Sequence, residues 1–255
     1  MTKRFLLIGQ RDSVLDVLAA HPAADLAGCI AIIGSHLERA ARVRGLPTIS
    51  VKRGEKTAAL AAIESTAFDV LLSVGCPWKL PIARLRERMP DALFLNVHPS
   101  CLPRLRGAHP LNGAILNDEP RIGASVHVME EEFDTGALIA QRCIERTEEL
   151  DLALLYAVSR LLEAEAMQLA LETLVASDFA YRGIPLVVPI PFLPWAAAIL
   201  ERLNAASAPA LLSTGHVVIW GTLLAAAVIL GRWYRTPLAW VGAAALVALV
   251  CRLIG

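Results

Sequence analysis

The sequence predicts an α/β fold, in which a domain built on a mostly parallel sheet is followed by a C-terminal hydrophobic helical hairpin. Two observations predict the domain: short apolar runs alternate with helical patterns, and the apolar runs are nearly continuous. That combination is typical of a parallel sheet covered on both faces. A third observation predicts the hairpin, because only five charged residues occur between Ile184 and the end of the 255-residue chain.

The elements of the domain follow from these patterns in chain order. Strands are expected at 4–9, 28–34, 47–50, 69–75 and 92–97, and helices at 12–21, 35–45 and 56–66. Asp12 or Ser13 is the expected N-cap of the first helix, and Ser35 that of the second, which Gly45 ends. The domain is completed by a helix at 107–118, a strand pair at 123–129 and 137–144, and a long amphipathic helix at 151–177.

The C-terminal part has the composition of a membrane segment. The expected regions are the α/β domain at 1–183, a proline-rich linker and interfacial segment at 184–207, and two transmembrane helices at 208–231 and 237–255. Both apolar runs are close to the roughly 20 residues that span a bilayer. Arg232 and Arg235 between them oppose the positive-inside tendency if the domain is cytoplasmic. A re-entrant hairpin and a hairpin buried in a soluble protein therefore stay open as alternatives.

Charge and cysteine content exclude several classes of protein. The 24 Lys and Arg residues balance 24 Asp and Glu residues, and no basic stripe indicates a nucleic-acid partner. The five cysteines are odd in number and form no CxxC pair, which favours free thiols in a reducing compartment. The N-terminal apolar run is too short for a signal peptide. We therefore expect a membrane-associated protein whose α/β domain lies in the cytoplasm.

One loop carries a pattern that points to chemistry. In LNVHPSCLPRLRG, at 95–107, Asn96 and His98 lie where a strand ends, which is where open parallel sheets bind ligands. Alternate residues of a strand share a face, so an amide that can stabilise an oxyanion and an imidazole that can move a proton point into one space. Asp134, on a glycine-containing loop, is the best candidate for a carboxylate that orients His98. Each residue taken alone is more simply a turn or capping residue.

The longer segment NVHPSCLPRLRGAHPLNGAILNDEPRIGASVHVMEEEFDTGALIAQ, at 96–141, resembles the catalytic core of the folate-dependent formyltransferases. The features are the Asn-x-His-Pro-Ser-x-Leu-Pro run, Arg-Gly at 106–107, AILN, GASVHVM and Asp-Thr-Gly at 134–136. In order of elements the resemblance covers residues 4–178. It implies a Rossmann-like formyltransferase domain that takes a formyl group from 10-formyltetrahydrofolate and transfers it to an amine.

The resemblance also implies roles for individual residues. Asn96, His98 and Asp134 match the catalytic Asn, His and Asp of the family. By this match Asn96 stabilises the oxyanion, His98 moves the amine proton, and Asp134 holds His98 or relays a proton through water. Folate contacts are implied for the turn after His98 and for the stretch SVGCPWKLP. The candidate folate-contacting residues are Ser100, Cys101, Leu102, Pro103, Cys76, Trp78 and Leu80.

Several other residues have a plainer interpretation. Trp78 is equally consistent with the core, and His127 in its strand is interpreted as a packed structural residue. No metal is expected, because no HxxxH-type spacing connects His98, His109 and Asp134. The roles of three cations stay unassigned between ligand contacts and solvated surface, namely Arg104, Arg106 and Arg121.

The motif does not identify the amine. Because prolines and apolar runs occupy the place of the β-barrel of tRNA-directed relatives, we expect a membrane-anchored enzyme acting on an aminosugar or an amine-bearing, lipid-linked molecule. Two alternatives stay open. One is a formyltetrahydrofolate hydrolase with the same triad, which would release formate without an amine. The other is a non-catalytic, membrane-bound folate-binding or scaffold protein, in which His98→Ala would change no amine formylation.

Overall fold

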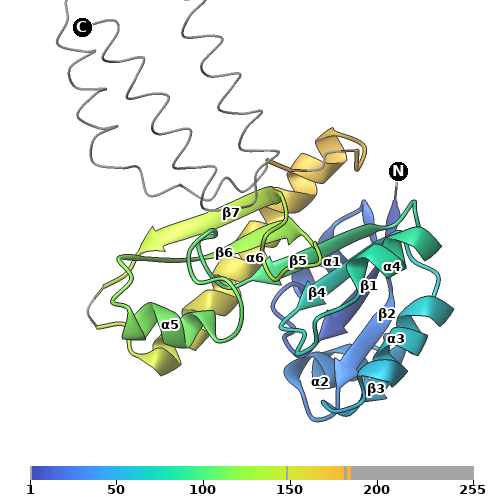
Figure 1. Ribbon diagram of the computed structural model, residues 1–255, viewed down its shortest axis with the longest axis horizontal. Coiled ribbons are helices and arrows are strands. Elements are labelled where there is room, and N and C mark those ends of the chain that lie inside the picture. The colour runs from blue at the N-terminus through green and yellow to red at the C-terminus, as the bar shows by residue number, and fades with distance from the viewer. Residues whose placement is uncertain (1, 148, 181–182, 185–255) are drawn as a thin grey trace, which may run out of the picture. The chain divides into compact units, whose positions relative to one another are not determined.

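The computed structural model describes residues 2–147, 149–180 and 183–184, and in them seven strands form one sheet in the order β3-β2-β1-β4-β5-β6-β7 (Figure 1). The strands are β1 (Lys3–Gly9), β2 (Ala24–Ile32), β3 (Thr48–Val51), β4 (Val70–Val74), β5 (Leu93–His98), β6 (Arg121–Val128) and β7 (Leu138–Glu145). The first five strands are parallel, whereas β6 pairs antiparallel with both β5 and β7. The expected mostly parallel sheet is therefore confirmed.

Helices cover both faces of the sheet. They are α1 (Leu15–Ala20), α2 (His36–Val43), α3 (Lys56–Ser65), α4 (Ile82–Arg88), α5 (Pro110–Leu116) and α6 (Leu152–Ala176). One core cluster contains side chains of α1, α2, α5 and α6, and a second contains those of α3 and α4. Alternate residues of β1 enter the two clusters, since Phe5 belongs to the first and Leu6 to the second. This division explains why the central strands read as continuous apolar runs.

The first helix departs from its expected start. It begins at Leu15, and its N-cap position is Val14, which makes no side-chain capping bond. The hydroxyl of Ser13 instead donates to the buried carboxylate of Glu163 on α6. The Ser13 hydroxyl therefore bonds to a residue far away in the sequence and does not cap the helix. The second helix follows the expectation, because Ser35 Oγ accepts a hydrogen bond from the backbone N–H of Glu38.

The order of the strands predicts a ligand-binding crevice at the carboxyl ends of the central strands. From β1 the chain builds outward to β2 and β3, and it then returns to β4 on the other side of β1. Ligands of open sheets bind outside the carboxyl ends of strands at such a reversal. Gly9 has a φ of +138°, and a Cβ there would lie 2.2 Å from the carbonyl oxygen of Val74. The loop after β1 is thereby held against the end of β4, next to the end of β5.

The cysteines differ from the expectation of free thiols. Cys101, in the loop after β5, forms a disulfide with Cys143 on β7, while Cys29 and Cys76 are free. The prediction of free thiols is therefore wrong for Cys101 and Cys143. The two lie 42 residues apart in the chain. Their proximity arises because the loop folds over the antiparallel strands, which spacing along the sequence does not reveal.

The C-terminal regions fall largely beyond this description. The chain divides into two compact units, Met1–Val188 and Pro189–Gly255. Of the expected linker at 184–207 only Ile184 is described, and it bridges to Leu138 on β7. The expected transmembrane helices at 208–231 and 237–255 lie outside the described residues. Among the helices that are described, none is long and apolar enough to cross a membrane.

Candidate active site

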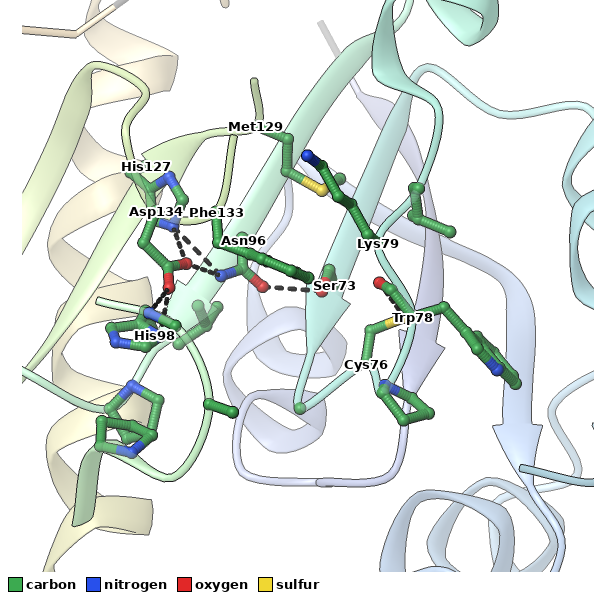
Figure 2. A pocket seen from close by; sticks show the side chains of 18 of the residues that line it. Ser73, Cys76, Trp78, Lys79, Asn96, His98, His127, Met129, Phe133 and Asp134 are labelled. Atoms are coloured by element: carbon green, nitrogen blue, oxygen red, sulfur yellow. Dashed lines mark hydrogen bonds and ion pairs between the residues drawn. The ribbon is translucent and has the colours of Figure 1, made fainter. Parts of the chain in front are cut away.

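A pocket of about 390 Å³ lies at the carboxyl ends of β1, β4 and β5 (Figure 2). Its apolar lining comes from the segment after β4 and from the loop that connects β6 to β7. The apolar residues that line it include Trp78, Leu80, Ile82, Met129 and Phe133. Asn96, His98, His127 and Asp134 line the same pocket. The sheet thus brings a polar cluster and an apolar surface together in one cavity.

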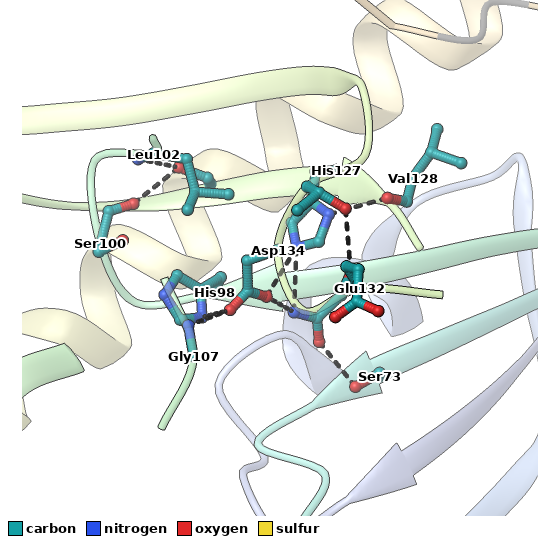
Figure 3. A network of polar contacts seen from close by, with 12 residues as sticks. Ser73, His98, Ser100, Leu102, Gly107, His127, Val128, Glu132 and Asp134 are labelled. Carbon is teal, nitrogen blue, oxygen red and sulfur yellow. Dashed lines mark hydrogen bonds and ion pairs between the residues drawn. The ribbon is translucent and has the colours of Figure 1, made fainter. Parts of the chain in front are cut away.

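Asp134 is the centre of the polar cluster. Its Oδ2 lies 3.3 Å from His98 Nδ1 and accepts a hydrogen bond of 2.7 Å from the backbone N–H of Gly107. Its Oδ1 lies 3.2 Å from His127 Nε2 and accepts a 3.2 Å hydrogen bond from Asn96 Nδ2. The side chain is only 6% exposed. Figure 3 shows this carboxylate between the two imidazoles. The three residues of the predicted triad therefore meet at one point.

The hydrogen bonds of His98 define its tautomer. Nε2 lies 2.8 Å from the carbonyl oxygen of Leu105, which can only accept a hydrogen bond, so Nε2 carries a hydrogen. Nδ1 of the neutral ring is then bare, and it faces Asp134. A proton taken up by His98 therefore arrives at Nδ1, where the carboxylate stabilises the imidazolium.

His127 is the residue that the sequence analysis missed. Its Nδ1 lies 2.9 Å from the carbonyl oxygen of Val128, so Nδ1 carries a hydrogen, and Nε2 faces Asn96 and Asp134. Nε2 lies 3.1 Å from Asn96 Nδ2. The signal that could have identified His127 is register, because His127 on β6 pairs directly with Asn96 on β5. A strand pairing predicted between 92–97 and 123–129 would have placed it beside the triad.

The amide of Asn96 is oriented by a neighbour on β4. The hydroxyl of Ser73 donates a 2.7 Å hydrogen bond to Asn96 Oδ1. Ser73 and Asn96 are paired in the parallel ladder between β4 and β5. With the oxygen held by Ser73, the NH₂ group turns toward Asp134 and His127 (Figure 2). The donor that an oxyanion requires therefore points into the polar cluster.

Burial and charge poise the cluster for proton transfer. Burial lowers the pKa of His98, and this outweighs the nearby charge of Asp134 and the Leu105 carbonyl, which raise it. Burial alone would raise the pKa of Asp134. The hydrogen bond with His127, the charge of His98 and the Gly107 N–H together lower it below its usual range. At neutral pH the cluster therefore combines an ionised carboxylate with a neutral imidazole.

The loop that carries Asp134 is held on α4. Arg86 forms a bidentate pair with Glu130 and donates a 2.6 Å hydrogen bond to the carbonyl of Met129. Lys79 pairs with Glu132 on the same loop. A Cβ at Gly136 would lie 1.8 Å from the Val128 carbonyl oxygen, so only glycine allows this close approach at the loop end. The sequence analysis did not identify α4, which supplies this support.

The candidate folate-contacting residues separate into two groups. Cys76, Trp78 and Leu80 line the pocket, although Trp78 is 9% exposed and also packs in the core. The second group does not line it, since the turn packs on β6 and β7 instead; this group comprises Ser100, Cys101, Leu102 and Pro103. Folate contacts by this turn remain a prediction, and the geometry favours the first group.

The unassigned arginines also lie away from the pocket lining. Arg104 forms a bidentate pair with Glu119, and Arg121 pairs with Glu145. Arg106 is half-buried, and its Nε has no hydrogen-bond partner within the described part of the chain. The pocket is lined by other cations, which are Arg11, Arg53 and Lys79.

Comparison with known proteins identifies the domain. A family described as "Formyl transferase" matches residues 21–171. A methionyl-tRNA formyltransferase from a Synechococcus strain is 38% identical over 104 residues, which are 40% of this chain and 31% of the relative. A methionyl-tRNA formyltransferase from Thermus thermophilus is 36% identical over 106 residues, covering 42% and 34% of the two chains. The matched part thus spans about a third of the length of these curated relatives.

Solved structures show the same fold. Phosphoribosylglycinamide formyltransferase from Anaplasma phagocytophilum superposes with a TM-score of 0.60 at 21% identity, over 70% of this chain and 89% of that one. A formyltetrahydrofolate deformylase from Pseudomonas syringae gives 0.58 at 23% identity, over 70% and 62%. At these identities the likeness concerns the fold alone.

These comparisons correct the predicted localisation. The sequence analysis placed the protein at a membrane. The curated relatives are named as formyltransferases of methionyl-tRNA, and the solved relatives as formyltransferases of phosphoribosylglycinamide or as a deformylase of formyltetrahydrofolate. The prediction of membrane association is therefore wrong, and its cause was the assignment of the two apolar runs from composition alone.

Proposed function

This chain belongs to the formyl transferase family, and from that premise we propose that it moves a formyl group from 10-formyltetrahydrofolate to the nitrogen of a primary amine. One observation carries the proposal. The carboxylate of Asp134 lies 3.2–3.3 Å from Asn96 Nδ2, His127 Nε2 and His98 Nδ1 on the wall of the same pocket. An ionised acid, a neutral base and an amide donor are the groups that acyl transfer to an amine needs.

The residues present fit the proposed donor. A pterin is a flat ring with polar edges, and the pocket offers it apolar side chains beside polar ones such as Gln10 and Ser73. The residues that would hold it are Cys76, Trp78, Leu80, Met129 and Phe133. Phe133 is 51% exposed and lies under the ammonium group of Lys79, so its ring is available for stacking. When bound, 10-formyltetrahydrofolate supplies the formyl carbon and the nitrogen that leaves.

His98 and Asp134 act together on the amine proton. Because Nε2 of His98 is committed to Leu105, the nitrogen that accepts a proton is Nδ1. Protonation there converts the 3.3 Å contact between the carboxylate of Asp134 and a neutral ring into an ion pair. Asp134 remains ionised throughout, since its pKa lies below the usual range. The pair can then return the proton to the departing nitrogen.

Asn96 is the donor for negative charge on oxygen, and His127 controls its availability. Asp134 Oδ1 accepts one N–H of Asn96, and His127 Nε2 lies 3.1 Å from the same amide nitrogen. His127 Nε2 also lies 3.2 Å from Asp134 Oδ1, so a hydrogen on Nε2 would point to the carboxylate and leave the second N–H of Asn96 free. An oxyanion-stabilising donor can be worth roughly 3–4 kcal/mol in the transition state. The proposal therefore assigns His127 a role beside the triad.

For the acceptor we propose a hydroxyl-bearing primary amine such as an aminosugar. Its support is the hydrogen-bonding character of the rest of the lining, which includes Gln10, Arg11, Arg53, His109 and Tyr156. Tyr156 is 42% exposed and lies 6.0 Å from the guanidinium of Arg11, which provides a flat surface for a sugar ring. No lipid enters the proposal.

The test is an assay of the full chain with formyl-labelled 10-formyltetrahydrofolate. The acceptors are a nucleotide-linked aminosugar, the same sugar without its amine, methionyl-tRNA and phosphoribosylglycinamide, together with a control without acceptor. We expect label on the aminosugar and none on the amine-free sugar. Labelled formate in the control, at the same rate, would instead identify a hydrolase. An unchanged product yield with His98→Ala would show that the site is not catalytic.

A further inference from the structure

The loop that follows His98 is anchored on the antiparallel end of the sheet. Ser125 on β6 donates a 2.7 Å hydrogen bond to the carbonyl of Ser100 and accepts one from the N–H of Leu102 (Figure 3). Gln141 on β7 donates a 2.9 Å hydrogen bond to the carbonyl of Leu102. Neighbours of Ser125 on its strand, such as Ala124, pack in the core with α6, so the loop lies on the opposite face.

A disulfide also fixes this loop to the sheet. Cys101 and Cys143 are linked, with Cα atoms 6.0 Å apart, which is within the ordinary range for a disulfide. Gly123 pairs in register with Cys143. A Cβ at Gly123 would lie 2.5 Å from one sulfur and 2.8 Å from the other. The two sulfurs therefore occupy the space that a side chain on β6 would fill.

The loop that the disulfide holds also contacts the imidazole of His98. Within the loop, Ser100 Oγ donates a 2.7 Å hydrogen bond to the carbonyl of Arg104. The next residue, Leu105, has a left-handed φ of +56° and presents its carbonyl to His98 Nε2 at 2.8 Å. The position of that carbonyl sets which nitrogen of His98 carries hydrogen. Displacement of the loop would therefore change the tautomer at the catalytic nitrogen.

We propose that the Cys101–Cys143 disulfide positions His98 through the Leu105 carbonyl, and that the oxidation state of this cysteine pair sets the activity of the site. The inference rests on the proposed catalytic role of His98. Cys101 and Cys143 are positioning residues, since neither lines the large pocket. With the disulfide open, the loop keeps the hydrogen bonds with Ser125 and Gln141 and the Arg104–Glu119 pair, but it loses its covalent link to β7.

The chemistry is ordinary thiol–disulfide exchange with a small disulfide such as oxidised glutathione. The thiolate of one cysteine attacks a sulfur of the small disulfide and displaces one thiolate, which takes up a proton. The second cysteine, as its thiolate, attacks the resulting mixed disulfide and displaces the second small thiol. Two protein thiols are oxidised, one small disulfide is reduced to two thiols, and a dithiol reverses the reaction.

The remaining described cysteines are poor competitors for this exchange. Cys29 is buried, and burial raises the pKa of its thiol to about 12. Burial likewise raises the pKa of Cys76 to about 11. Both thiols stay protonated near neutral pH, and the thiolate is the attacking form. Cys101 and Cys143 are each partly exposed, so a small disulfide or dithiol can reach them.

The test compares the full chain after treatment with oxidised glutathione and after treatment with a dithiol. Alkylation followed by mass spectrometry reports the state of each cysteine. Nitrogen-15 NMR of the histidine rings reports the tautomer of His98, and this readout needs no turnover. We expect one Nε2–H tautomer in the oxidised protein and an averaged signal in the reduced protein. Where turnover is measurable, we expect kcat to fall at least about tenfold on reduction, because small misplacements of a catalytic group are costly.

Variants separate positioning from general destabilisation. Cys143→Ser should reproduce the reduced state under both treatments, whereas Cys29→Ala, which removes a buried free thiol outside the pocket lining, should keep the redox response. An unchanged His98 spectrum on reduction would overturn the inference. So would alkylation of both Cys101 and Cys143 in the glutathione-treated protein. Loss of turnover in both redox states, with the spectral change intact, would count against the proposed function alone.

Discussion

His98 Nδ1 lies 3.3 Å from Asp134 Oδ2, and the backbone carbonyl of Leu105 holds the other nitrogen of the same ring. This relationship makes Nδ1 the only nitrogen of His98 that can take up a proton. It also joins residues from the end of β5 and from the loop between β6 and β7, 36 positions apart in the printed sequence. The predictions below follow from this contact and from the groups that support it.

The first prediction concerns pH. The base must be neutral, so kcat/KM should rise with pH through the pKa of His98. Because burial lowers that pKa, the acid limb should lie below about pH 6.5, the ordinary value for histidine. Asp134→Asn removes a charge that raises the pKa of His98, so the limb should move to still lower pH. A limb that stays in place would belong to the acceptor amine and would contradict the assignment to His98.

The second prediction concerns His127. His127→Ala should lower kcat about tenfold or more, since general acid–base and orienting contacts are typically worth that much. It should also raise the pKa of Asp134, because the hydrogen bond with His127 is the largest of the contacts that lower it. Carbon-13 NMR of the Asp134 carboxyl group measures that pKa directly. If both kcat and the carboxyl titration are unchanged, His127 is the packed structural residue of the original interpretation.

The third prediction concerns the support of the Asp134 loop. Arg86→Met removes the bidentate pair with Glu130 and the bond to the Met129 carbonyl. We expect a higher KM for the donor and a lower kcat, with stability changed by less than about 1 kcal/mol, as is usual for exposed pairs. Arg88→Met is the matched control, because Arg88 lies on the same helix and pairs with Glu64. Equal kinetic effects of the two variants would contradict a specific role for the contacts of Arg86 with the Asp134 loop.

The fourth prediction concerns Glu163, which is fully buried beside Arg11 and Ser13. Burial raises its pKa despite these partners. A raised pKa contributes stability that is present below the unfolded-state value and is lost as pH rises through the folded-state value. The wild-type protein should therefore gain stability relative to Glu163→Gln as pH falls from 8 toward 5. Thermal unfolding of both proteins across this range measures the difference, and a constant gap would refute the prediction.

The sequence predicted most of the fold for a physical reason. Strands such as β4 and β5 are buried on both faces, so they appear as continuous apolar runs that little else can explain. Ser35 caps α2 as expected because its acceptor lies only three residues away. Patterns that depend only on nearby residues are therefore found again in the structure. The short helix α4, flanked by prolines and rich in charge, has no apolar stripe long enough to identify it.

The sequence predicted those site residues whose chemistry and spacing within one segment indicate a shared face. It missed the residues that only the folding of distant segments brings to the site. Asn96 and His98 share a strand, so their common face could be inferred. The role of His127 depends on the antiparallel pairing of β5 with β6, and that of Leu105 on a backbone carbonyl, which no residue type encodes. The disulfide depends on the loop folding over β7. The apolar C-terminal runs show the opposite error, since composition alone was read as a membrane location.

The most direct test of the account is a single-turnover experiment with excess enzyme and formyl-labelled 10-formyltetrahydrofolate. It compares the wild-type protein with Asp134→Asn and His98→Ala, each with and without the aminosugar acceptor. The account predicts labelled N-formyl product from the wild-type protein only when the acceptor is present, and a loss of about 10²-fold or more in both variants. Donor consumption at the wild-type rate by either variant would contradict it, as would labelled formate as the sole product.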